Sequence, residues 1–201
     1  MTLRLLLATT NPAKIREYSL LFQGAPLRLI TLAEEGIKVE VSETGSTIEE
    51  NARMKAAAYA VDDRFLIAAD DSGLEVDALG GQPGPLSARF AGKNASDKEK
   101  VALLLSRLAG VPWEKRSARF RCVIAIASAS QILGVFEGEC QGVIAFEPRG
   151  SQGFGYDPVF YLPELGKTMA ELSIEEKNRV SHRGKAARKA LRFLKKYVPG
   201  N

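Results

Sequence analysis

The chain has 201 residues, of which 45% are hydrophobic, so it can bury enough surface to fold without disulfides or a structural metal. Lysine and arginine outnumber aspartate and glutamate by 28 to 24, a mild excess concentrated near the C-terminal end. No apolar run is long enough to span a bilayer, and the N-terminus lacks the layout of a signal peptide. We therefore expect one cytoplasmic domain spanning residues 1–201, with no membrane partner.

The first predicted unit is a strand, a tight turn and a helix. Residues 3–8 are a continuous apolar run, and residues 9–14, Thr-Thr-Asn-Pro-Ala-Lys, place Pro12 at the start of a helix capped by Asn11 or Thr10. We expect free backbone amides and the positive end of the helix dipole to face one space there, which is typical of phosphate binding. The segment lacks the glycines of a Walker A loop, and the same residues also begin ordinary helices.

Later helices are marked by capping boxes, in which a hydroxyl and a glutamate three residues later satisfy each other's backbone amides. The pattern occurs as Thr47 with Glu50, Ser96 with Glu99 and Ser173 with Glu176. The first of these opens an alanine-rich helix that is predicted to reach about residue 60.

Two alternating apolar stretches, residues 120–127 and 132–146, predict long strands paired as a hairpin, with glycines that permit bulges. Strands interleaved with helices, plus this one antiparallel pair, predict an α/β fold with a mixed, twisted sheet. Cys122 and Cys140 lie in these stretches without a Cys-x-x-Cys spacing, so we expect buried free thiols.

The apolar residues 65–69 run directly into Asp70 and Asp71, which Ser72 and Gly73 follow. This pattern predicts a buried strand that ends at two adjacent carboxylates. Such a pair is costly to bury unless a cation or a hydrogen-bond donor compensates it, and magnesium is the usual cation at such a place. The alternative is a plain polar turn, because Asp, Ser and Gly all favour turns.

A second charged region surrounds the helix predicted after Thr47. Lys55 falls in its second turn, and Glu43 lies in the preceding loop. Glu49 and Glu50 are explained by their positions near a helix N-terminus. Glu43 has no such explanation, so it is the acid that we expect to join the two aspartates.

Two further segments carry groups suited to a planar ligand. Residues 153–158, Gly-Phe-Gly-Tyr-Asp-Pro, form a glycine-flanked loop in which Phe154 or Tyr156 could stack on a base, although a core aromatic in a turn has the same pattern. His182 lies in residues 181–184, Ser-His-Arg-Gly, whose side chains form a donor cluster suited to carbonyl oxygens on a ligand. The alternative is that His182 is a helix cap or a surface residue.

The last predicted helix is strongly basic. Its cations are Arg183, Lys185, Arg188, Lys189, Arg192, Lys195 and Lys196. Ala187, Leu191, Leu194 and Val198 recur at helical spacing, which favours the solvated face of an amphipathic helix. A nucleic-acid-binding surface is the alternative.

Taken together, these segments resemble the inosine triphosphatase family of non-canonical purine nucleoside triphosphate pyrophosphatases (Ham1/RdgB-like). The blocks that match in order are residues 8–14, 47–55, 69–74, 83–89, 153–157 and 181–183, and residues 169–173 and 176–178 also fit. The family usually has glycine before the lysine of its first block, where this chain has Ala13. We expect the helix to begin cleanly there, since alanine is the better helix former.

The resemblance implies an α/β fold with two lobes around a cleft, as in the inosine triphosphatase and Maf proteins. It also implies magnesium-dependent hydrolysis of ITP, dITP and XTP to the monophosphate and pyrophosphate by a homodimer. The alternatives are a Maf-like pyrophosphatase for pyrimidine or modified nucleotides and a basic nucleic-acid-binding module.

Residue roles follow from the matching positions of the resemblance. Asp71 would be the general base and a magnesium ligand, with Asp70 and Glu43 as further ligands. The triphosphate would be held by Thr9, Thr10, Asn11, Pro12, Ala13, Lys14, Lys55 and Ser72. The base would be recognised by Phe154, Gly155, Tyr156, Asp157, Lys177, His182 and Arg183.

Overall fold

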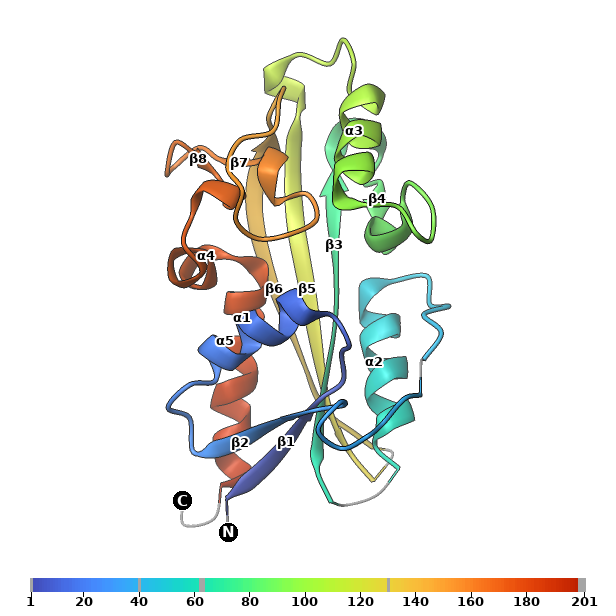
Figure 1. Ribbon diagram of the computed structural model, residues 1–201, viewed down its shortest axis with the longest axis vertical. Coiled ribbons are helices and arrows are strands. Elements are labelled where there is room, and N and C mark those ends of the chain that lie inside the picture. Colours follow the sequence, from blue (N-terminus) through green and yellow to red (C-terminus); the bar gives the residue numbers. More distant parts are fainter. Residues whose placement is uncertain (1, 40, 62–63, 130, 199–201) are drawn as a thin grey trace.

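The computed structural model describes residues 2–39, 41–61, 64–129 and 131–198. Its strands form one eight-stranded sheet in the order β2-β1-β3-β5-β6-β7-β8, with β4 paired to β3 (Figure 1). The strands are β1 (Leu3–Leu7), β2 (Leu27–Thr31), β3 (Leu66–Val76), β4 (Pro83–Gly84), β5 (Ser117–Ser128), β6 (Gln131–Ile144), β7 (Phe160–Leu162) and β8 (Lys167–Thr168). The α-helices are α1 (Pro12–Leu21), α2 (Ile48–Tyr59), α3 (Asp97–Arg107), α4 (Ile174–Val180) and α5 (His182–Leu194).

The sheet is mixed, as predicted, but it is mostly antiparallel. Within the described residues, the parallel pairs are β1 with β2 and β1 with β3. The expectation of a single antiparallel pair was wrong, since β3 pairs antiparallel with β4 and with β5, β5 with β6, β6 with β7, and β7 with β8. The connections from β5 to β6 and from β7 to β8 are too short for a crossover, so they reverse the chain.

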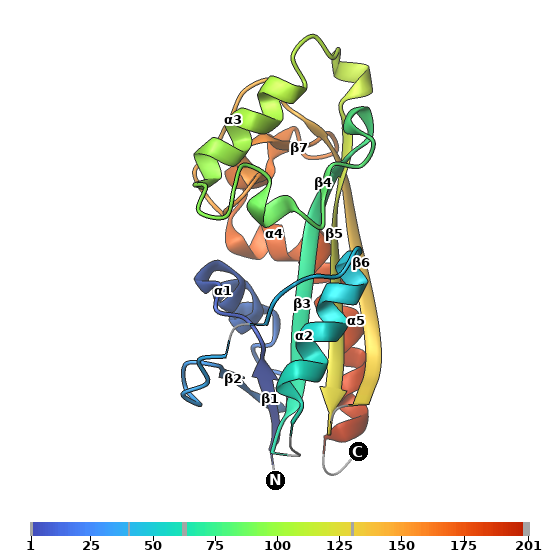
Figure 2. The same cartoon turned by 90° about the vertical axis from the view of Figure 1, so that its right-hand side faces the viewer.

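Three long strands, β3, β5 and β6, join two groups of helices (Figures 1 and 2). We call the part with α1, α2, α5, β1 and β2 the lower lobe, and the part with α3, β4, β7 and β8 the upper lobe. In the lower lobe, alternate residues of β1 face opposite sides: Leu6 packs into the core under α2, and Leu5 packs into the core under α1 and α5. A third core, with Leu104 of α3 and Phe160 of β7, fills the upper lobe.

The acid pair does not end its strand. β3 continues from Leu66 through Asp70 and Asp71 to Val76, and its pairing with β5 runs from Ile67 to Val76. The backbone of the acid pair is therefore satisfied by β5 on one side. On the other side β3 pairs with β1 as far as Ala68 and with β4 at Leu74 and Glu75, so within the described residues the stretch 69–73 has no strand partner on that side.

The predicted helix starts are confirmed. Asn11 caps α1, and Thr47, Ser96 and Ser173 each form the predicted capping box. The hairpin is also confirmed, with a bulge beside Gly134 in β6. Both cysteines are buried free thiols. Across the described part of the chain, the helices include none with the length and apolar character needed to cross a membrane.

Candidate active site

A cleft of about 410 Å³ lies between the lobes, a volume suited to a nucleotide-sized ligand. It brings together fifteen of the residues singled out from the sequence: Thr9, Thr10, Asn11, Lys14, Glu43, Lys55, Asp71, Ser72, Phe154, Gly155, Tyr156, Asp157, Lys177, His182 and Arg183. Pro12, Ala13 and Asp70 are not among its lining residues. The first two form the start of α1, and Asp70 is 1% exposed.

The start of α1 supplies one end of the cleft. The Asn11 side chain accepts hydrogen bonds from the backbone amides of Ala13 (2.9 Å) and Lys14 (3.2 Å), and the Asn11 amide donates to Thr9 Oγ1 (3.2 Å). The expectation that these amides are free was therefore wrong, because the Asn11 side chain occupies those of Ala13 and Lys14, and Thr9 Oγ1 occupies that of Asn11. The groups that face the cleft here are the side chains of residues 9–11 and of Lys14.

Two lysines anchor this end to the acids. Lys14 Nζ lies 3.1 Å from Asp70 Oδ1 and 3.0 Å from Asp70 Oδ2. Lys55 Nζ donates to the carbonyl oxygen of Asp70 (2.6 Å) and pairs with Glu43 Oε1 (2.5 Å). Burial alone would lower the pKa of Lys55, but the charges of Asp70 and Asp71 raise it, so Lys55 stays protonated.

Asp71 has a different environment from its neighbour. Its Oδ2 accepts from Asn51 Nδ2 (3.1 Å) and its Oδ1 from the Ser72 amide (2.9 Å), and no ion pair to it is found within the described residues. Burial raises the pKa of Asp71, and the nearby charges of Lys55 and Lys14 offset this only in part. Asp71 is therefore a buried carboxylate whose charge is incompletely compensated.

Asn51 orients this carboxylate, and the sequence reasoning did not assign it a role. It is fully buried, and its Oδ1 accepts from the Gly45 amide (2.8 Å), which ties the loop after Glu43 to Asp71. A signal was present, because Asn51 and Lys55 stand four residues apart and so share one face of α2.

The negative charge of Asp70 is fully compensated by neighbouring cations. Burial would raise the pKa of Asp70, but the charges of Lys14 and Arg183 outweigh it and hold the pKa far below the usual range. Arg183 Nε lies 3.5 Å from Asp70 Oδ2, and Arg183 Nη2 donates to Ser72 Oγ (3.0 Å). Because both carboxylate oxygens of Asp70 already contact cations, these contacts do not favour it as a metal ligand. A metal-binding role of Asp70 stays a prediction.

Glu17 on α1 links the two buried cations of the site. Its Oε2 lies 2.6 Å from Arg183 Nη1, and its Oε1 lies 2.7 Å from Lys177 Nζ. Lys177 also pairs with Asp157 Oδ2 (2.5 Å), and all four side chains are at most 3% exposed. Sequence reasoning missed Glu17 because nothing near it in the chain distinguishes it from a surface helix residue.

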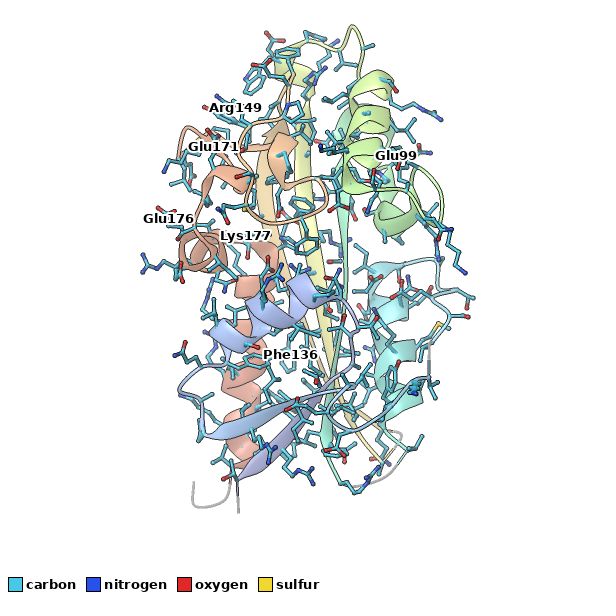
Figure 3. The ribbon with its side chains drawn as sticks, in the orientation of Figure 1. Glu99, Phe136, Arg149, Glu171, Glu176 and Lys177 are labelled. Carbon is cyan, nitrogen blue, oxygen red and sulfur yellow. The ribbon has the colours of Figure 1, made fainter. Side chains whose placement is uncertain are left out.

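These pairs join into one network of six charges with alternating sign, of which five are buried and Lys14, with a side chain 12% exposed, is partly buried. Its members in order are Asp157, Lys177, Glu17, Arg183, Asp70 and Lys14. Figure 3 shows Lys177 at the level between the two groups of helices. We call this set the charge network.

The other end of the cleft is aromatic. The Phe154 ring centroid lies 4.7 Å from Lys177 Nζ and 5.4 Å from Arg183 Cζ. The His182 imidazole stacks on Phe120, with ring centroids 4.7 Å apart. His182 Nδ1 is buried and has no hydrogen-bond partner within the described residues, and burial together with the Arg183 charge lowers the pKa of His182 well below its ordinary value.

A glycine lets the start of α5 approach the sheet. A Cβ atom at Gly138 of β6 would collide with the carbonyl oxygen of His182 and with the amide of Ala186. The first turn of α5 therefore lies directly on β6, which places His182 and Arg183 as buried residues in the lining of the cleft and not on the outer surface.

The donor set fits a hard divalent cation. Asp71 and Glu43 are two carboxylates that both line the cleft. Burial raises the pKa of Asp71, the charges of Lys55 and Lys14 lower it, and the negative charge of Glu43 raises it further, so the two carboxylates are close to each other. No cluster of three or more acidic, histidine or cysteine side chains within the described residues forms a complete metal cage. Two carboxylates with room for waters and phosphate oxygens match magnesium.

Replacing Glu17 tests the charge network. Glu17→Ala leaves two buried cations without their shared acid, so we expect the free energy of unfolding, measured by urea denaturation, to fall by about 3–5 kcal/mol. Glu75→Ala is the matched control, because Glu75 also bonds two arginines, Arg119 (2.7 Å) and Arg121 (3.1 Å), whose side chains are 41% and 33% exposed. Its cost should be about 1 kcal/mol or less. Equal losses in the two variants would contradict the account.

The chain is similar in sequence and in structure to known proteins. The Ham1 family model matches residues 5–193. The chain is 51% identical to a dITP/XTP pyrophosphatase of Geobacillus kaustophilus over 92% of this chain and 91% of that protein. It is 50% identical to a dITP/XTP pyrophosphatase of Desulforamulus reducens over 96% of each chain. The solved structure of a HAM1 protein from Coxiella burnetii superposes with a TM-score of 0.87 at 41% identity, covering 96% of this chain and 99% of that one. The chain belongs to the Ham1 family.

Proposed function

We propose that the protein hydrolyses non-canonical purine nucleoside triphosphates, namely ITP, dITP and XTP, to the nucleoside monophosphate and pyrophosphate. The observation that carries the proposal is Asp71, a buried carboxylate without a cation partner among the described residues, set between lysines at one end of the cleft and aromatic and donor groups at the other. Two relatives with about half of their residues identical are named dITP/XTP pyrophosphatases.

We infer that Asp71 and Glu43 hold magnesium when the substrate is bound. The metal would supply charge neutralisation on the phosphates and a more acidic bound water. Asp71 is placed to take the proton of the water that attacks the α-phosphorus, because Asn51 and the Ser72 amide fix its carboxylate. Lys14 and Lys55 would stabilise the charge on the departing pyrophosphate.

Base selection follows from hydrogen-bond polarity. Hypoxanthine and xanthine carry a carbonyl oxygen at the 6-position, where adenine carries an amino group. His182 Nδ1 is a candidate donor to that oxygen, because it has no hydrogen-bond partner within the described residues. Arg183 is the other candidate, since its donations to Glu17, Asp70 and Ser72 use three of its five N–H groups. A neutral His182 protonated at Nδ1 would donate to the carbonyl and would face adenine's own donor.

We also propose that the protein is a single domain over residues 1–201, that it forms a homodimer in solution and that it lies in the cytoplasm. The proposed ligand of the cleft is a nucleotide. The names of the relatives support the nucleotide substrate. No observation favours a nucleic acid, since the basic helix α5 buries Ala186, Ala187, Ala190 and Leu194 as an amphipathic helix does.

A substrate panel tests the proposed function. The protein is incubated with ITP, dITP, XTP, ATP, GTP and CTP in the presence of magnesium, and pyrophosphate is scored separately from orthophosphate. We expect pyrophosphate from the first three at rates at least about tenfold above ATP, and loss of turnover on chelation. Orthophosphate as the first product would contradict the mechanism, and preferred turnover of CTP would support a pyrimidine-directed enzyme instead.

Substitution of His182 tests base recognition. His182→Ala removes one hydrogen bond to the 6-carbonyl, so the ratio of kcat/KM for ITP to that for ATP should fall by up to about tenfold. Steady-state kinetics with both substrates measure the ratio, and circular dichroism controls for folding. An unchanged ratio, with a folded variant, would remove His182 from this role.

A further inference from the structure

The aromatic loop, residues 153–157, is held by contacts within the loop and with other elements. Asp157 Oδ2 accepts from the Phe154 amide (2.8 Å) and pairs with Lys177 Nζ (2.5 Å), and Tyr156 Oη donates to the carbonyl oxygen of Ser87 (2.9 Å). A further contact comes from α3, because the Gly155 amide donates to Asp97 Oδ2 (2.6 Å). The position of Phe154 in the cleft therefore depends on α3 as well as on the loop itself.

Asp97 bridges that loop to a lysine of the cleft wall. It is the first residue of α3, and its Oδ1 lies 2.6 Å from Lys100 Nζ. The side chain of Lys100 is 14% exposed, and both residues line the cleft. A carboxylate that accepts from both a backbone amide and an ammonium group makes two charge-assisted hydrogen bonds, which are stronger than neutral ones.

The contact fixes a conformation that the loop would otherwise leave. Gly155 has φ of 62°, in the left-handed region that glycine enters without steric cost but also leaves readily. A Cβ atom at Gly155 would meet nothing within 4 Å, so no close neighbour on that side limits its backbone. The hydrogen bond to Asp97 is a direct restraint on the backbone of this residue.

We propose that Asp97 is a positioning residue for substrate binding: it holds the aromatic loop in its binding conformation before the nucleotide arrives, and Lys100 neutralises its charge. The nucleotide part rests on the proposed function. Asp97 touches neither the metal ligands nor the phosphate end, so its loss weakens binding of the base and leaves the chemical step nearly unchanged.

A purely structural role for Asp97 is separable from this one. An acidic residue in the first turn of a helix stabilises the helix through its dipole, and Asp97 has that position. Glu99, labelled in Figure 3, lies in the same first turn of α3, and its Oε2 accepts from the Ser96 amide (2.7 Å) and the Ser96 hydroxyl (2.7 Å). Glu99 thus supports the same helix end without a bond to the loop, which makes Glu99→Ala the matched control.

The experiment compares Asp97→Ala, Asp97→Asn and Glu99→Ala. In the free protein, hydrogen exchange of peptides covering residues 150–158 should become about tenfold faster in Asp97→Ala and stay near the parent rate in Glu99→Ala. Asp97→Asn keeps an oxygen that can accept from Gly155, so it should lie between them. Equal exchange in Asp97→Ala and Glu99→Ala would overturn the proposal, whatever the kinetics show.

Steady-state kinetics test the second part of the proposal, that Asp97 affects binding of the nucleotide and not the chemical step. With ITP, KM should rise about tenfold in Asp97→Ala while kcat stays within about twofold, and Glu99→Ala should change neither. A fall in kcat with unchanged KM would overturn the positioning role. If the parent protein hydrolyses no nucleotide, the proposed function fails, and the exchange measurement still decides whether Asp97 holds the loop.

Discussion

Six charges of alternating sign, five of them buried, determine how the site is put together. Charged side chains taken out of water are stable only when they are paired closely and hydrogen-bonded, so each member of the charge network fixes the position of the next. The network runs from Asp157, in the aromatic loop, through Glu17 on α1 to Lys14 at the other end of the cleft. Because it links the aromatic loop to the start of α1, the distance between the base-binding and phosphate-binding ends is set before any ligand is present.

The geometry of one strand separates the roles of two adjacent acids. Successive residues of a β-strand face opposite sides of the sheet, so Asp70 shares its side with Ala68 and the core under α1 and α5, and Asp71 shares its side with Ala69 and the core under α2. Asp70 therefore meets Lys14 and Arg183 and has a lowered pKa despite burial. Asp71 meets Asn51 and the lysines only at longer range, and burial raises its pKa. The pair that the sequence presents as a unit becomes one structural and one available carboxylate.

Local features could be predicted from the sequence and long-range ones could not. The capping boxes at Thr47, Ser96 and Ser173 are encoded within four residues, and all of them form. The predicted strand end at Asp70 was wrong because turn propensity lost to pairing with β5, which is distant in the sequence. Glu17 was missed because its partner Arg183 lies 166 residues away. The family resemblance brought most cleft residues together, but it gave no role to Asn51, which lies in one of its blocks, and it did not include Asp97; both residues contact other groups of the site.

Magnesium binding by two neighbouring variants tests the division of roles between the acids most directly. Calorimetric titration of magnesium into the protein, with an inosine triphosphate analogue that cannot be cleaved between its α- and β-phosphates, gives the affinity for each variant. The account predicts that Asp71→Asn weakens magnesium binding by at least about tenfold, while Asp70→Asn binds within about threefold of the parent. Loss of binding in Asp70→Asn with near-normal binding in Asp71→Asn would contradict it.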